Sequence, residues 1–327
     1  MDIEKIFETG VKNLQAAHAA HEVEKKGILR AGNTGIHDDG EVSGKCARLT
    51  YLRFKGIEVD DGDDSKELMF ASGRGNEDLW MEVLVASKMI PVIKREEEIP
   101  IAWQTKKGTW VTGRPDVVLC DAEGKPTHGL ELKLLCSFWT ALDAINCKPK
   151  MIHLAQAAHY SWKLDVPFDL CYASRVNWYV PAEAWIQNKL PREGQVGSDV
   201  LEFTVKMDKK TGEEKSFIKT VKPFRRTFNM KIDEAGTVFY KEVSKEVWTE
   251  SVISIPRIQS YFELVDCMDD TNVLPARPLN LDAEGNEAGY KLCSYCELQS
   301  TCKTFEKKGL DKWKEAVVEF VNTEKGK

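Results

Sequence analysis

The chain has 327 residues, of which 42% are hydrophobic and 30% charged, a composition typical of a soluble globular protein with one large domain or two smaller ones. No apolar stretch approaches the roughly 20 residues needed to span a bilayer. The N-terminal segment carries charges where a secretory signal needs an apolar centre, so we expect a cytoplasmic protein without a membrane partner. The net charge of −6 excludes a uniformly basic nucleic-acid coat but leaves local basic patches open.

The first half of the chain is predicted to alternate helices with strands, because apolar residues recur first at helical and then at β spacing. Helices are expected over residues 2–27, 45–54, 65–88 and 150–164. Strands are expected over residues 91–101, 109–120, 129–135 and 168–180. The order helix, three strands, helix, strand predicts an α/β core with a central mixed β-sheet and helices on both faces.

The second half is predicted to begin with short strands and charged turns over residues 199–243, which indicate a β-hairpin insertion. The stretch from Lys206 to Arg226 has eight basic and three acidic residues, a local sum of 8 − 3 = +5. It either contacts phosphates or forms a solvated hairpin tip. Helices are expected over residues 246–266 and 310–322.

We therefore predict a single domain with four parts. These are an N-terminal helical part (1–64), a core (65–185), the β-hairpin insertion (186–245) and a C-terminal helical part (246–327).

Acidic residues and a lysine stand within two of the predicted strands. Asp116 leads an apolar run, whereas Glu131 and Lys133 alternate with leucines and must share one face of their strand, since strand side chains alternate with period two. Carboxylates that converge on Mg²⁺ or Mn²⁺ are what phosphodiester hydrolysis needs. A lysine beside them can orient or deprotonate the attacking water. Taken alone the pattern is weak, because charged edge strands are common.

Two further motifs lie at suitable distances from this pair of strands. Upstream, the run GRGNE at 73–77 places Glu77 on a helix. Downstream, the run QAAHY at 156–160 places Gln156 and Tyr160 four residues apart, on one helical face. His159 lies between them, where we expect a packing or surface role.

The ordered set GRGNE, GRPD, ELK and QAAHY resembles the RecB-like branch of the PD-(D/E)xK nuclease superfamily, over about residues 73–160. The resemblance implies a restriction-endonuclease-like core and a divalent metal, Mg²⁺ or Mn²⁺. It also implies the roles of individual residues. Asp116 and Glu131 would bind the metal ion, and Lys133 would act on the attacking water. DNA contact or bracing of the site would be the role of Arg114, Gln156 and Tyr160. Glu77 stands near the position where iron–sulfur relatives usually carry a histidine, and either replaces it as a ligand or faces solvent.

Four of the nine cysteines form a separate pattern. Cys293, Cys296 and Cys302 lie within ten residues, and Cys46 is the candidate for a fourth ligand. One distant cysteine plus a C-terminal triplet is similar to the 4Fe-4S site of RecB-like nucleases, including the CRISPR-associated adaptation exonucleases and AddB-type subunits. Zinc in the same cage and four unconnected thiols are the alternatives. A cluster would act as an iron–sulfur clip joining the N- and C-terminal segments.

The resemblance implies a DNA exonuclease that acts on single strands or duplex ends, with recombination, repair or CRISPR-adaptation proteins as possible partners. The alternative is a non-catalytic DNA-end-binding subunit of a helicase or integrase complex. A hydrolase directed at RNA or nucleotides is also left open by these motifs.

Overall fold

The computed structural model describes residues 27–56, 64–95, 98–207, 212, 214–270, 275, 277–287, 293, 296 and 302–303, without the side chains of 64–74 and 76. The helices predicted over 2–27 and 310–322 lie outside these residues, apart from Gly27. None of the described helices is both long enough and apolar enough to cross a membrane.

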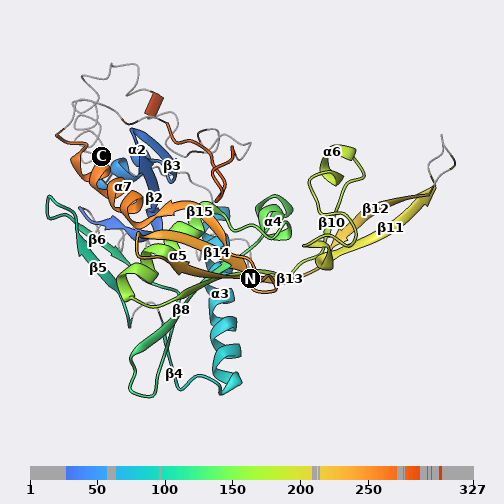
Figure 1. Ribbon diagram of the computed structural model, residues 1–327, viewed down its shortest axis with the longest axis horizontal. Helices are drawn as coiled ribbons and strands as arrows, with labels where there is room; N and C mark the ends of the chain where they lie inside the picture. Colours follow the sequence, from blue (N-terminus) through green and yellow to red (C-terminus); the bar gives the residue numbers. More distant parts are fainter. Residues whose placement is uncertain are drawn as a thin grey trace, which may run out of the picture.

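A seven-stranded mixed sheet forms the centre of the protein, in the order β15-β14-β13-β9-β8-β7-β4 (Figure 1). Its strands are β4 (Val92–Arg95), β7 (Val117–Cys120), β8 (Pro126–Leu134), β9 (Phe168–Ser174), β13 (Phe224–Ile232), β14 (Thr237–Glu242) and β15 (Thr249–Ser254). Only β8 and β9 run parallel among these neighbours; the other pairs are antiparallel. Parallel neighbours need a crossover, and here it contains α4 (Phe138–Ile145) and α5 (Met151–Leu164).

Helices cover both faces of this sheet, as the sequence predicts. On one face, Met81 of α3 (Asp64–Ser87) packs in a small cluster with Leu130 and Leu132 of β8. On the other face, α5 contributes to the main core, with Leu154 and Tyr160 buried there. β8 is therefore apolar on the α3 side, and its alternate side chains turn toward the α5 side.

Smaller elements surround this core. Two short sheets are formed by β1 (Leu29–Arg30), β6 (Trp110–Gly113) and β5 (Ile101–Gln104), and by β2 (Gly35–Asp38) with β3 (Glu41–Gly44). Two further helices of the body are α2 (Ala47–Phe54) and α7 (Ile255–Cys267), and short 3₁₀ turns lie at Ala31–Asn33 and Ser198–Val200. α7 packs against α2, β2 and α5.

A separate three-stranded sheet forms an arm that projects from the body (Figure 1). It contains β10 (Trp178–Tyr179), β11 (Leu201–Met207) and β12 (Glu214–Val221), with the short helix α6 (Ala184–Gln187) beside it. The predicted insertion over 186–245 is thus too long. It ends with β12, because β13 pairs with β9 and continues the central sheet.

The basic stretch from Lys206 to Arg226 is divided between the sheet of the arm and the central sheet. Arg226 lies on β13, is only 7% exposed and pairs with Asp199, so the prediction that it contacts phosphates is wrong. Arg225 also belongs to β13 and lies over the Trp80 ring. The predicted helix over 246–266 is wrong in its first part, where β15 pairs with β14 before α7 begins.

Gly129 of β8 is required by a close approach of the neighbouring strand. A Cβ at this position would lie 2.1 Å from the ring of Phe168, which is fully buried. We expect Gly129→Ala to lower the free energy of unfolding by about 1–3 kcal/mol, the usual cost of overpacking. Chemical denaturation measures this.

Gly75→Ala is the matched control for that experiment. A Cβ on Gly75 in α3 would meet no described atom within 4 Å, so this change should stabilise the protein by about 0.5–1 kcal/mol. Equal effects of the two changes would contradict the packing explanation.

Candidate active site and cysteine pocket

Asp116, Glu131 and Lys133 meet at the junction of β7 and β8. Asp116 directly precedes β7, and Val117 pairs with Leu130, so the antiparallel register sets Asp116 beside Glu131. Glu131 and Lys133 share the face of β8 opposite Leu130 and Leu132. The predicted convergence of the three side chains is therefore present.

The three side chains form a connected and largely buried group. Asp116 Oδ2 accepts a hydrogen bond from the Leu132 N–H at 2.7 Å and lies 3.8 Å from Lys133 Nζ. Lys133 Nζ donates to Glu131 Oε1. Glu131 is 0% exposed, whereas the Asp116 and Lys133 side chains remain 13% and 23% exposed. The described residues give the buried Glu131 Oε2 no hydrogen-bond partner.

Burial and mutual charge shift the pKa of each group. Burial, aided by the charge of Asp116, raises the pKa of Glu131 to about 8. Burial also raises the pKa of Asp116, against the opposing charge of Lys133. For Lys133, burial acts to lower the pKa, but the charges of Glu131 and Asp116 outweigh it and raise the pKa. Lys133 is therefore a firmly protonated ammonium group in this arrangement.

Two side chains of α5, Gln156 and Tyr160, lie near the carboxylates. Gln156 Nε2 donates to the Tyr160 hydroxyl at 3.1 Å, as their spacing on one helical face predicts. Burial, with the charge of Glu131, raises the pKa of Tyr160 well above its ordinary value, and a backbone hydrogen bond from Arg114 acts in the opposite direction. Arg114 itself is exposed. Gln156 and Tyr160 are thus bonded to each other near Glu131, Arg114 is exposed beside them, and the bracing role stays a prediction.

Glu77 lies close enough for its charge to act on Glu131 and Lys133. Within the part of the chain that the structure describes, however, no group of three or more His, Cys, Asp or Glu side chains is placed to hold a metal ion. Asp116 and Glu131 form a pair of carboxylates without Glu77 as a third member. The ligand role of Glu77 stays a prediction.

A divalent cation fits this pair by its chemistry. Mg²⁺ and Mn²⁺ prefer oxygen ligands, and both side chains supply carboxylate oxygens. Glu131 Oε2 is buried and lacks a partner, which is costly unless a donor or a cation satisfies it.

His153 of α5 is a further buried group that the sequence motifs do not single out. Its Nδ1 lies 2.9 Å from the Tyr172 hydroxyl, and burial, together with the nearby charge of Lys133, lowers its pKa well below the ordinary value. His153 is three residues before Gln156, and this helical spacing was the available signal. His159 has the packing role we expected, because it is fully buried and bonded to Trp103 Nε1 at 2.7 Å.

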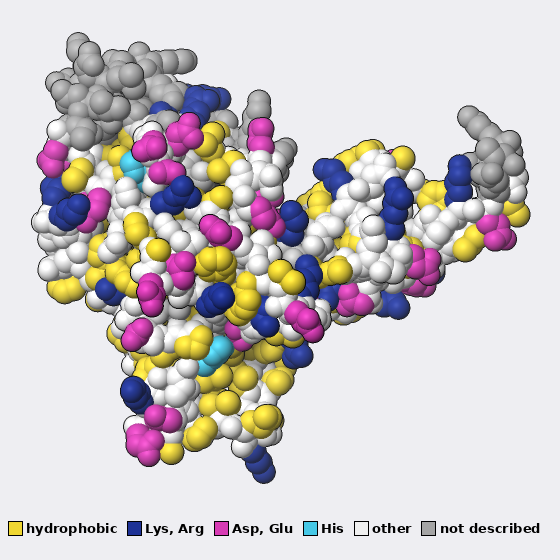
Figure 2. Space-filling model, viewed as in Figure 1, with side chains coloured by type: hydrophobic (Ala, Val, Ile, Leu, Met, Phe, Trp, Pro, Cys, Tyr) yellow, Lys and Arg dark blue, Asp and Glu magenta, His cyan; other side chains and the backbone are white. Residues whose placement is uncertain are grey.

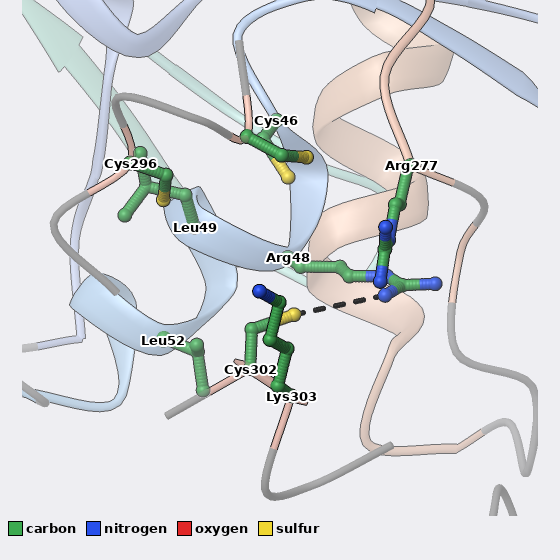
Figure 3. Close-up of a pocket in the computed structure, with 9 residues that line it drawn as sticks. Cys46, Arg48, Leu49, Leu52, Arg277, Cys296, Cys302 and Lys303 are labelled. Atoms are coloured by element: carbon green, nitrogen blue, oxygen red, sulfur yellow. Dashed lines mark hydrogen bonds between the residues drawn. The ribbon is translucent and has the colours of Figure 1, made fainter. Parts of the chain in front are cut away.

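The four predicted cysteines line one pocket at the start of α2. Cys46 precedes the first residue of that helix, and Cys293, Cys296 and Cys302 reach the same pocket. Figure 3 shows Cys46, Cys296 and Cys302 around α2, with Arg48 directed at Cys302 at 3.6 Å. Burial raises the pKa of Cys46 to about 11.

The pocket also contains positive charges and apolar side chains. Arg48, Arg277 and Lys303 line it together with Leu49 and Leu52. Several cations around four cysteines would offset the negative charge of thiolate ligands. The sulfur donors and their charged surroundings fit a thiolate-bound metal centre in chemical type, although no three of them are placed to hold a single ion.

No protein-family model, curated protein or solved structure matches this chain.

Titration of Glu131 is expected to make the stability of the protein depend on pH. Its folded-state pKa of about 8 lies above the ordinary value of 4.5. The stabilisation it contributes is therefore complete below the lower value and is lost as the pH rises through the higher one. Glu131→Gln should flatten the fall in melting temperature between about pH 5 and pH 8, because an amide does not titrate.

Thermal unfolding at a series of pH values measures this effect. Glu234→Gln, in the exposed turn after β13, is the control and should leave the slope as it is in the unaltered protein. An identical slope in the Glu131 variant would show that Glu131 does not titrate in this range.

Proposed function

We propose that this protein is a metal-dependent DNA nuclease that hydrolyses phosphodiester bonds with Mg²⁺ or Mn²⁺. The observation that carries the proposal is the buried Oε2 of Glu131, which has no hydrogen-bond partner among the described residues and lies beside Asp116 and Lys133. The resemblance of the surrounding motifs to RecB-like nucleases supports the same activity. The same resemblance is the basis for proposing, more narrowly, an exonuclease that acts on DNA ends or single strands.

The residues would divide the chemistry among them. Asp116 and Glu131 would hold the cation, which when bound stabilises the charge that develops on the scissile phosphate. Lys133 is partly exposed and has a raised pKa, so it suits a role as a hydrogen-bond donor that orients the attacking water or a phosphate oxygen. That assignment is favoured over deprotonation of the water, because Lys133 already carries its proton.

The bracing residues would keep these donors in place. The buried Tyr160 hydroxyl holds Gln156 and stays protonated, since its pKa is raised. A site of this kind depends on fixed geometry, because reacting groups must be held close to the productive arrangement.

We also propose a structural 4Fe-4S cluster on Cys46, Cys293, Cys296 and Cys302. All four cysteines line the same pocket, although among the described residues no three of them are grouped to hold one ion. The resemblance of the cysteine pattern to that of cluster-bearing RecB-like nucleases supports a 4Fe-4S cluster rather than zinc.

A non-catalytic DNA-end-binding subunit is the second candidate. It is favoured by one observation, the lack of a third metal ligand beside Asp116 and Glu131 among the described residues. A nuclease-like fold that has lost its chemistry would bind DNA ends without cutting them.

One assay separates the two candidates. The purified protein is incubated with end-labelled single-stranded and blunt duplex DNA, in Mn²⁺ or in EDTA. We expect degradation with Mn²⁺ and none with EDTA. Intact DNA under both conditions, with the protein bound to it, would support the non-catalytic subunit instead.

A further inference from the structure

Two exposed tryptophans stack on each other between the body and the arm. The rings of Trp139 in α4 and Trp185 in α6 are 5.7 Å apart, with an angle of 9° between their planes. They are 53% and 55% exposed, and neither belongs to a hydrophobic core cluster. Large aromatic side chains that add nothing to the core and gather at the surface commonly mark a binding site.

Trp139 is held by a well-defined helix start. Ser137 caps α4: its side chain accepts a hydrogen bond from the Thr140 N–H, and its own N–H donates to Thr140 Oγ1. Phe138 meets the Trp139 ring edge-on at 5.1 Å. Trp139 thus lies in the first turn of the helix that follows β8, the strand of Glu131 and Lys133.

Trp185 is held just as firmly. Its neighbour Ile186 is buried, and the Gln187 side chain exchanges two hydrogen bonds with the backbone of Ile218 in β12, at 2.9 and 2.8 Å. Asn146, at the end of α4, donates to the Lys189 carbonyl at 3.0 Å and so ties α4 to the segment after α6. The stacked pair is therefore preorganised.

Positive charge accompanies the two rings. Lys189 Nζ lies 5.4 Å from the Trp185 ring and 6.0 Å from the Trp139 ring. Figure 2 shows further Lys and Arg side chains along the arm, with Asp and Glu side chains among them. Exposed lysines on its described strands and at the end of β12 are Lys206, Lys215, Lys219 and Lys222. Aromatic faces next to a line of cations are the combination that binds single-stranded nucleic acid, with bases on the rings and phosphates on the lysines.

We propose that Trp139, Trp185 and Lys189 form a stacking platform for the unpaired bases of a DNA strand. Bases within a duplex are stacked on each other, so a duplex offers an indole only the faces of its terminal pairs, whereas an unpaired strand can offer the face of any base. That the bound strand then leads to Glu131 and Lys133 rests on the proposed nuclease function. Binding of the strand to the platform does not.

The test is strand binding in EDTA, where no hydrolysis is expected. A fluorescent oligothymidylate and a blunt duplex of the same length are titrated with the protein, and anisotropy gives each dissociation constant. We expect the single strand to bind more tightly than the duplex. Trp139→Ala and Trp185→Ala should each weaken binding of the single strand by roughly 5- to 150-fold, the loss of one stacked base.

Three further variants make the result specific. Lys189→Glu changes only an exposed side chain. It should also weaken binding of the single strand, and the loss should be greater at low salt than at high salt. Trp139→Phe keeps an aromatic face and should restore part of the affinity. Trp110→Ala removes a 49% exposed tryptophan on β6, away from the arm, and should change nothing.

Unchanged strand affinity in both alanine variants, with folding verified by circular dichroism, would overturn the platform and favour a protein-docking role for the two rings. Preference for duplex over single strand would also overturn it. Failure of the nuclease proposal looks different, because the platform variants would still lose strand affinity in EDTA while the unaltered protein cut no DNA in Mn²⁺.

Discussion

Lys133→Ala is expected to lower the rate of DNA hydrolysis by about 10²- to 10⁴-fold, the usual contribution of one positioned acid–base or hydrogen-bonding group. Lys133 is the partly exposed cation that Glu131 and Asp116 hold at the junction of β7 and β8. Its loss would remove the proposed hydrogen-bond donor to the phosphate or the attacking water. The fold should survive without the Lys133 ammonium group, because the buried Glu131 can become neutral by binding a proton. Its pKa is already raised to about 8.

Initial rates on an end-labelled oligonucleotide at saturating Mn²⁺ measure this loss. Lys133→Met keeps the aliphatic stem and should be equally inactive, which separates lost charge from lost packing. Lys94→Ala is the matched control, since Lys94 lies on β4 of the same sheet and bonds the Gly124 carbonyl at 3.1 Å. Full activity in the Lys133 variants would remove Lys133 from the mechanism.

Cys46→Ala is expected to abolish a brown visible absorbance and the bound iron, and to lower the free energy of unfolding. Cys46 precedes α2, whereas its proposed partners come from the far end of the chain, so the centre would act as a cross-link. Loss of a native cross-link in a protein typically costs about 2–5 kcal/mol. Iron and sulfide analysis, the visible spectrum and denaturant unfolding measure the three effects.

Cys136→Ala provides the comparison, because Cys136 is exposed and does not line the pocket. It should retain iron and colour. A colourless unaltered protein with stoichiometric zinc would replace the cluster with a zinc site, and iron retained in full by the Cys46 variant would exclude Cys46 as a ligand.

Local pattern was sufficient for the elements that build the site. The helical spacing of residues 150–164 and 65–88 predicts α5 and α3 closely, since periodicity is set by the face that each helix buries. The alternation of Leu130, Glu131, Leu132 and Lys133 predicts which β8 side chains face the carboxylate site.

Errors arose where long-range pairing decides the structure. β13 resembles part of a charged hairpin in the sequence, but its partner is β9, far away along the chain. β15 was predicted as helix, although its partner is β14 and α7 begins only after the Ser254 cap. Arg226 is buried because Asp199 neutralises it, a contact that local composition does not contain. The stacking of Trp139 on Trp185 likewise depends on the docking of α6 beside α4.

Anomalous diffraction from crystals grown with Mn²⁺ would most directly test whether Asp116 and Glu131 hold a divalent cation beside Lys133. We expect a manganese peak within about 2.0–2.6 Å of the Asp116 carboxylate and of Glu131 Oε2, the atom that lacks a partner. At saturating Mn²⁺, density between these side chains without a manganese peak, or a peak bound only elsewhere, would contradict the proposed metal site.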